Sequence, residues 1–205
     1  MGYKTPETKP ITKVEDLDFS KIYSYRDYLS WTFEERLEII KGKIFRMSPA
    51  PYTSHQRVSQ KLNFRLMLFL QNHKCEVFTA PFDVRLPGYT PNDGDIYTVL
   101  QPDLCVICDP SRIDEKGCLG TPDLVVEILS PDNNRKELHN KFDIFEESGV
   151  LEYGIIHPAE RTVVQYQPDD KGRYQASRLC TIGDTIHSAV LPGFELKLKE
   201  VFGKN

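Results

Sequence analysis

Two acidic residues stand within stretches of sequence that are otherwise apolar. Asp103 lies near the start of the run at residues 101–108, and Glu127 lies inside the run at residues 121–131. Both runs are short, rich in β-branched residues and bounded by Pro or Gly, a pattern typical of buried strands. A buried carboxylate is unfavourable unless it is paired, protonated or bound to a metal. Two of them on neighbouring strands predict a site for a divalent cation.

The predicted cation is Mg²⁺, with Mn²⁺ as a substitute, and its predicted ligands are Asp103 and Glu127. Mg²⁺ prefers oxygen ligands, keeps several waters and accepts phosphate oxygens of a substrate. A bound metal acidifies water and stabilises charge on a phosphate, so the chemistry indicated is phosphoester hydrolysis. Asp123 shares a strand face with Glu127, but an Asp after Pro is more typical of a strand start or a turn, and we favour that role for it.

A cation beside the attacking water would complete such a site, and helical phase selects Lys141. Residues 133–148 are predicted to form a helix whose apolar stripe includes Leu138. At 100° per residue, Lys141 lies roughly 60° from Leu138, whereas Lys136 lies roughly 160° away. Lys141 can therefore turn toward the sheet, and Lys136 should be solvated. Arg135, at roughly 60° on the other side of Leu138, is the alternative.

A second principal helix is predicted to begin near Ser54, and it carries a histidine. His55 points within about 60° of the apolar stripe of this helix, so its imidazole should face the body of the protein. The stripe follows helical spacing and consists of Val58, Leu62, Leu66 and Phe69.

The rest of the chain supplies short strands around these helices. Residues 1–19 are polar and predict a flexible arm, and a helical stretch is expected within residues 20–36. Residues 37–47 predict a hairpin that turns at Lys-Gly, with Glu38 on its exposed side. Further strands are expected at residues 76–86, with a local break at Pro81, and at residues 152–157, 162–167 and 173–180. Loops are expected at residues 87–95 and 109–120.

The order from residue 54 to residue 157 is helix, three strands, helix, strand. This order predicts an α/β fold with a central mixed β-sheet flanked by helices, preceded by the hairpin and followed by a C-terminal β extension. No linker divides the chain, so residues 20–205 are assigned to a single domain.

Composition narrows the class of protein. The chain has 205 residues, 40% of them hydrophobic and 27% charged, and a net charge of −4. There is no apolar run of about 18 residues and no apolar signal core at the N-terminus, so we expect a cytoplasmic protein without a membrane span. The negative charge argues against coating nucleic acid by bulk electrostatics but leaves room for a local basic face.

The five cysteines make a disulfide framework improbable in such a protein. Cys105 and Cys108 have the spacing of a zinc knuckle, but positions three apart on a strand face opposite sides. We therefore expect them to be buried thiols.

These residues resemble a known family. Pro102-Asp103 followed by Glu127-Ile128-Leu129 is similar to the PD-(D/E)XK nuclease motif. The central strings, from Asp103-Leu-Cys-Val-Ile to the segment around Lys141 and on to residues 149–158, resemble more closely the Uma family of bacterial restriction-endonuclease-like proteins. The likeness runs from about residue 38 to the Leu-Pro-Gly tail at residues 191–193.

The resemblance implies a restriction-endonuclease-like αβββαβ core with Asp103 and Glu127 as metal ligands. The superfamily pattern places a lysine at position 129, where this chain has Leu129. In the family the lysine has moved to the following helix, which implies Lys141. His55 matches a recurrent family histidine and is carried over as a member of the site.

Three functions follow, in order of preference. The first is a metal-dependent endonuclease that hydrolyses DNA phosphodiester bonds. The second is a nuclease-fold DNA-binding or regulatory module without cleavage, which the acidic balance and the lack of a dedicated DNA-reading motif keep open. The third is a hydrolase of small phosphoesters. DNA is the expected partner, and a homodimer would suit double-strand cutting because two strands need two sites.

Overall fold

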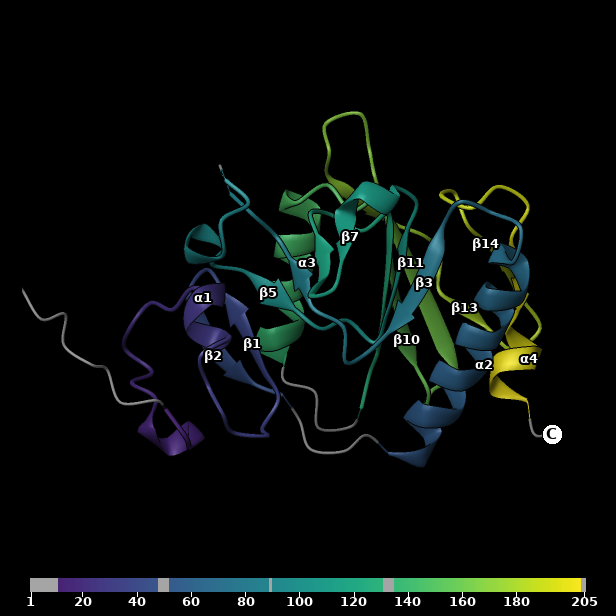
Figure 1. Ribbon diagram of the computed structural model, residues 1–205. Helices are drawn as coiled ribbons and strands as arrows, with labels where there is room; N and C mark the ends of the chain where they lie inside the picture. Colours follow the sequence, from purple (N-terminus) through teal and green to yellow (C-terminus); the bar gives the residue numbers. More distant parts are fainter. Residues whose placement is uncertain (1–10, 48–51, 89, 131–134, 204–205) are drawn as a thin grey trace, which may run out of the picture. The chain divides into compact units, whose positions relative to one another are not determined.

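The computed structural model describes residues 11–47, 52–88, 90–130 and 135–203 (Figure 1). The chain divides into two compact units. The first unit comprises the chain up to Met47 together with Pro87–Val99, and the second comprises Ser48–Leu86 and the chain from Leu100 onward. The division arises because residues 87–99 pair with the N-terminal hairpin, through Val99 opposite Ile39.

The first unit is built around the predicted hairpin, which the structure confirms. Strand β1 (Leu37–Ile40) pairs antiparallel with β2 (Lys43–Arg46). Lys41 and Gly42 have φ values of 49° and 78°. Positive φ at both central residues is the geometry that joins two strands without splaying them. The expectation for Glu38 is wrong, because all four residues of β1 are buried and Glu38 with them.

Part of the predicted flexible arm belongs to the core of this unit. A short 3-10 helix, η1 (Val14–Asp16), precedes Leu17, and both Val14 and Leu17 are buried. They pack in one cluster with residues of the hairpin and its flanks, namely Tyr23, Leu37 and Ile44. The arm prediction for residues 11–19 is therefore corrected, and its remainder, residues 1–10, lies outside the described residues. The predicted helix within residues 20–36 shrinks to α1 (Tyr25–Tyr28), which a capping box of Ser24 and Asp27 begins.

The second unit contains the predicted αβββαβ core. Strand β9 runs parallel to β10 and antiparallel to β6, so the sheet is mixed as expected. The strand order is β12 (Tyr174–Ala176), β11 (Thr162–Pro168), β10 (Glu152–His157), β9 (Leu124–Ile128), β6 (Leu104–Ile107) and β3 (Glu76–Thr79), with β13 (Cys180–Thr181) also on β11.

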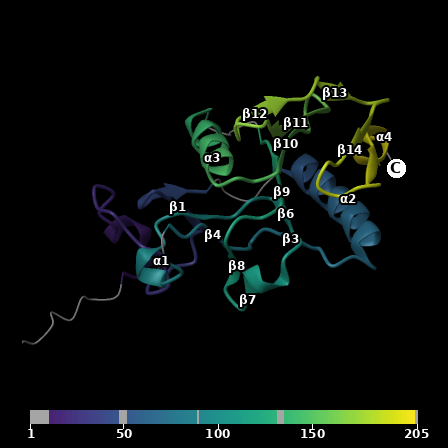
Figure 2. The same cartoon turned by 90° about the horizontal axis from the view of Figure 1, so that it is seen from above.

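Two long helices cover the two faces of this sheet (Figure 2). Helix α2 (Thr53–Leu70) packs its predicted stripe against one face, together with the C-terminal segment that ends in α4 (Leu198–Phe202). The strand residues on that face are Leu104, Val106, Leu124, Val126 and Ile128. Helix α3 (Arg135–Glu147) covers the other face, where Phe142 and Phe145 contact Tyr153 of β10.

Smaller elements complete the two units and correct one prediction. The strand expected at residues 76–86 is interrupted around Pro81 as predicted, since β3 ends at Thr79 and β4 (Val84–Arg85) begins five residues later. The charged loop at residues 109–120 contains a hairpin. The remaining elements are η2 (Asp93–Asp95), β5 (Val99–Leu100), η3 (Pro110–Arg112), β7 (Ile113–Asp114), β8 (Gly117–Leu119), β14 (Thr185–His187) and β15 (Glu195–Lys197). Within the described ranges no helix has both the length and the apolar character needed to cross a bilayer.

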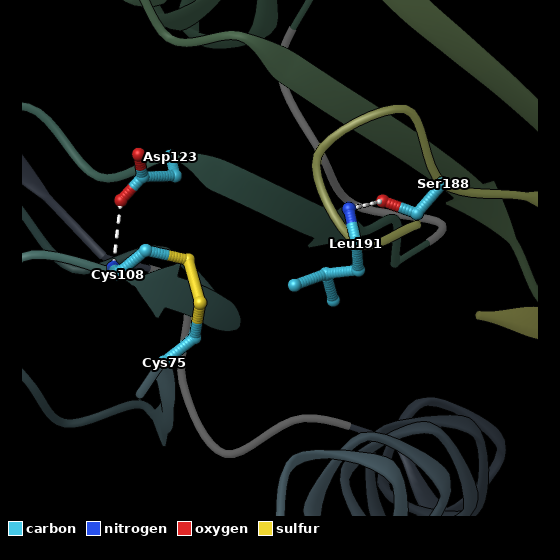
Figure 3. The surroundings of a disulfide bond; sticks show 5 residues. All are labelled: Cys75, Cys108, Asp123, Ser188 and Leu191. Carbon is cyan, nitrogen blue, oxygen red and sulfur yellow. Dashed lines mark hydrogen bonds between the residues drawn. A yellow bond between two sulfur atoms is a disulfide. The ribbon is translucent and has the colours of Figure 1, made fainter. Parts of the chain in front are cut away.

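The prediction of a buried free thiol is wrong for Cys108. Cys75 and Cys108 form a disulfide, while Cys105 is a buried free thiol as expected. In the antiparallel pairing of β3 with β6, Glu76 lies opposite Ile107, and the next step of the same register brings Cys75 opposite Cys108. The disulfide thus joins the start of β3 to the end of β6, next to the Asp123 carboxylate that accepts a hydrogen bond from the Cys108 amide (Figure 3).

We expect reduction of this disulfide to lower the free energy of unfolding. The bond closes a loop with a sequence separation of 33 residues, and loops of this size restrict the unfolded chain enough to contribute about 2–4 kcal/mol. Urea unfolding with and without a reductant measures the difference. The control is Cys75→Ala/Cys108→Ala, whose unfolding midpoint should not respond to the reductant, and an unchanged midpoint in the wild type would contradict the prediction.

Candidate active site

The pairing of β6 with β9 places the two candidate metal ligands on neighbouring segments. Leu104 pairs with Val126 and Cys105 with Val125. Asp103 directly precedes β6, so it lies one residue beyond the last of these pairs, next to the part of β9 that carries Glu127. The backbone at this edge also holds Asp103 in place, because the Ile128 amide donates to its Oδ2 at 2.7 Å.

Lys141 reaches Glu127 from the helix above the sheet. Its Nζ donates to Glu127 Oε1 at 3.0 Å, and both residues are buried, with 4% and 7% of their surface exposed. The helical phase places Lys141 beside Phe145, which is fully buried against the same sheet face. The alternative cation, Arg135, and Lys136 have side chains outside the described part of the structure. A buried carboxylate inside a strand thus acquires its counter-charge from α3.

His55 meets the other carboxylate. Its Nε2 lies 3.1 Å from Asp103 Oδ1, and only 7% of the residue is exposed. His55 stands in the first turn of α2, with its imidazole toward the body of the unit as the helical stripe predicted. Its Nδ1 is buried and forms no hydrogen bond within the described residues. Asp103 is therefore oriented from two sides, by the Ile128 amide and by the imidazole.

The four predicted residues thus occupy one region of the second unit. Asp103 and Glu127 lie on neighbouring segments of the sheet. His55 contacts Asp103, and Lys141 contacts Glu127. Asp123 lies apart, at the start of β9, where its Oδ2 accepts from the Cys108 amide at 2.8 Å. This is the strand-start role favoured for it.

The sequence interpretation overlooked Tyr153, which lies beneath the Glu127–Lys141 pair. Tyr153 is fully buried on β10, and its hydroxyl has no hydrogen-bond partner among the residues that the structure describes. Burial raises the pKa of the Tyr153 phenol well above its usual value, and the Glu127 carboxylate raises it further. The phenol therefore stays neutral at physiological pH. The available signal was that Tyr153 shares a face with Ile155 in the strand predicted at residues 152–157.

The site contains oxygen ligands suited to a hard cation. No group of three or more His, Cys, Asp and Glu side chains arranged to hold a metal occurs in the described ranges. The two carboxylates supply a partial set of ligands. Among the described residues each oxygen of Asp103 has one polar contact, to the Ile128 amide or to His55, which leaves lone pairs for a metal.

Comparison with solved structures identifies the class of fold. The crystal structure of a "putative nuclease" from Anabaena variabilis superposes with a TM-score of 0.65 over 88% of this chain and 97% of that chain, at 21% identity. A mixed sheet between helices, with this strand order, is thus a nuclease-like fold.

The chain belongs to the Uma2 family, described as "Putative restriction endonuclease", which it matches over residues 25–199. It is also similar to an uncharacterized protein of Synechocystis sp., with 27% identity over 162 residues, covering 75% of this chain and 81% of that protein. The resemblance noted from the central strings is therefore confirmed, and membership of this family supports a nuclease.

The buried pair makes a prediction about stability. Glu127→Leu or Lys141→Met alone removes one charge of a buried ion pair and should lower the free energy of unfolding by about 3–5 kcal/mol. The double variant Glu127→Leu/Lys141→Met removes both charges and should unfold within about 1 kcal/mol of the wild type, or be more stable. Urea unfolding of the four proteins completes a double-mutant cycle. Additive effects of the two single substitutions would show that the pair does not interact.

Proposed function

We propose that this protein is a Mg²⁺-dependent endonuclease that hydrolyses phosphodiester bonds of DNA. The observation that carries the proposal is a buried lysine–carboxylate pair beside a second carboxylate on the neighbouring strand. Lys141 and Glu127 lie 3.0 Å apart, and Asp103 directly precedes β6, the strand that pairs with β9. Family membership supports the same class of reaction.

The residues present fit a magnesium ion. Asp103 and Glu127 offer hard oxygen ligands from neighbouring segments, one directly before β6 and the other within β9. Mg²⁺ is commonly held by one or two carboxylates while waters and phosphate oxygens fill its other positions. When bound, Mg²⁺ would supply positive charge beside the phosphate and make a water molecule easier to deprotonate.

The protein side chains then have separate tasks. Glu127 holds the Lys141 ammonium at the edge of the sheet, where it can donate to the attacking water or to a phosphate oxygen as negative charge develops. His55 and the Ile128 amide fix the orientation of Asp103. Orienting contacts of this kind keep a ligand in its productive geometry.

The reaction is a hydrolysis and needs no further reactant. The oxygen of water forms a bond to phosphorus, and the bond from phosphorus to one sugar oxygen breaks. The protons of water end on the leaving sugar oxygen and in solvent, so that a phosphate monoester and a hydroxyl remain. Two such reactions, one per strand, would be required for a double-strand break, which suits a homodimer.

Removing either carboxylate without changing its size should abolish cleavage. Asp103→Asn and Glu127→Gln keep the shape of the side chains but weaken metal binding, so both should lose detectable Mg²⁺-dependent nicking of plasmid DNA. Gel assays with Mg²⁺, Mn²⁺ or EDTA, together with calorimetric titration of the metal, provide the measurement.

The matched control is Glu76→Gln. Glu76 is an exposed carboxylate on β3, opposite Ile107 at the far end of β6, and its loss should leave cleavage unchanged. If all four proteins bind metal and DNA alike and none cleaves, the protein is a nuclease-fold binding module. If metal-dependent activity appears on nucleotides and not on polymers, it is a small-phosphoester hydrolase.

Lys141→Gln should separate metal binding from chemistry. The substitution leaves both carboxylates in place, so metal should still bind. The cleavage rate should fall about 100- to 1000-fold, the usual cost of removing one electrostatic donor from a transition state. Circular dichroism at the assay temperature checks that the variant is folded. Cleavage at the wild-type rate would rule out a role for Lys141 in the reaction.

A further inference from the structure

A concavity of about 670 Å³ opens beside α2 in the second unit. Its lining comes from the first turns of α2, the turn that follows β10 and the end of α4. Ser54 lines it and directly precedes His55. Pro158 lines it and directly follows β10. Strand β10 runs parallel to β9, so the two strands have their C-terminal ends on the same side of the sheet. The concavity therefore lies next to the strand ends that carry the two candidate metal ligands.

The charged residues that line this concavity are all basic. They are Arg57, Lys61 and Arg161, and no Asp or Glu lies among its lining residues. Lys61 donates to the backbone carbonyl of Gly203 at 2.8 Å, which is a neutral partner and leaves the charge uncompensated. Arg57 and Arg161 are exposed. The concavity thus presents three positive charges to solvent.

The other arginines of this unit differ from Arg57 and Arg161 in their ion pairing. Where the structure describes their side chains, they form ion pairs with carboxylates: Arg65 with Glu200, Arg85 with Asp114, Arg112 with Asp109, Arg173 with Glu146 and Arg178 with Asp184. Arg57 and Arg161 have no such pair among the described residues. Both unpaired arginines face the same concavity, in a chain whose net charge is −4.

The turn at Arg161 does not favour an arginine. Its φ is 55°, in the left-handed region that Gly, Asn or Asp usually occupies. Residues kept in such conformations are concentrated at functional sites. The local backbone conformation therefore does not explain why position 161 is an arginine, whereas a requirement for positive charge in the concavity does.

The spacing on α2 fits a chain of phosphates. Arg57 and Lys61 are one helical turn apart, which is about 6 Å along the helix axis on one face. Successive phosphates of one DNA strand rise about 3.4 Å along the duplex, so the two side chains match phosphates about two nucleotides apart. The positive end of the α2 dipole lies at the same end of the concavity and adds to the attraction for an anion.

We propose that Arg57, Lys61 and Arg161 bind the phosphodiester backbone of DNA and hold it against the sheet edge that carries Asp103 and Glu127. The inference rests on the proposed nuclease function for the identity of the polymer. It adds the path of the backbone beside the site. The contacts are to phosphates, so they contribute affinity and position rather than base recognition.

The test measures DNA binding by fluorescence anisotropy in EDTA, so that cleavage does not interfere. The variant is Arg57→Gln/Arg161→Asn. Asn is chosen at position 161 because it tolerates the left-handed backbone conformation. Each lost phosphate contact reduces the salt dependence of the association constant by about one unit of log–log slope. The variant should therefore lose about two units of slope and bind duplex DNA roughly tenfold more weakly than the wild type.

The control removes the same amount of charge elsewhere. Arg173→Gln/Arg178→Gln deletes two exposed arginines that are already ion-paired, and it should bind with nearly the wild-type affinity and slope. Equal affinity and slope for the wild type and the Arg57→Gln/Arg161→Asn variant would overturn the proposed binding site. Absence of DNA binding by the wild type would do the same.

Cleavage assays distinguish failure of this inference from failure of the proposed function. If the Arg57→Gln/Arg161→Asn variant binds like the wild type while Asp103→Asn abolishes cleavage, the basic site is wrong and the nuclease stands. If the salt slope falls as expected and no protein cleaves DNA, the basic site stands and the proposed hydrolysis is wrong.

Discussion

The candidate site depends above all on the antiparallel register between β6 and β9. One ladder of backbone hydrogen bonds sets Leu104 opposite Val126. Asp103 directly precedes this ladder, and its carboxylate accepts a hydrogen bond from the amide of Ile128, the residue after Glu127. Because side chains alternate between the faces of a sheet, a slip of one residue would move one carboxylate to the other face. The distance between the two acids is thus a property of the strand pairing, and the pairing in turn depends on the apolar residues around it.

Those apolar residues specify the register because both faces of the sheet are covered. Leu124, Val126 and Ile128 pack under α2, whereas Val125 and Glu127 lie on the face covered by α3. An acidic residue on a buried face is tolerated only with a counter-charge, and Lys141 provides it at 3.0 Å. A buried ion pair contributes little net stability compared with apolar residues of similar size. Its presence in the middle of a well-packed strand is more readily explained by chemistry than by folding.

Local periodicity predicted those features that depend on one element at a time. The phase of α3 alone was enough to select Lys141, and the stripe of α2 was enough to turn His55 inward. Features that depend on pairing between distant segments could not be obtained in this way. Cys75 and Cys108 are 33 residues apart, and only the register of β3 with β6 brings them together. Val14 was assigned to a flexible arm because its neighbours are polar, yet Val14 and Leu17 are both buried and attach this segment to a core.

Net charge does not describe the charge that a ligand meets at one part of the surface, and the ion pairs of the second unit show why. A net charge of −4 describes the sum over all ionisable groups, but a ligand senses the charges that remain uncompensated near it. Most described arginines of the second unit are neutralised by carboxylates, so they add little to the local field. Arg57 and Arg161 have no carboxylate partner among the described residues, and both line one concavity. The fold of an acidic protein can therefore gather uncompensated positive charge at one place, which its net charge does not reveal.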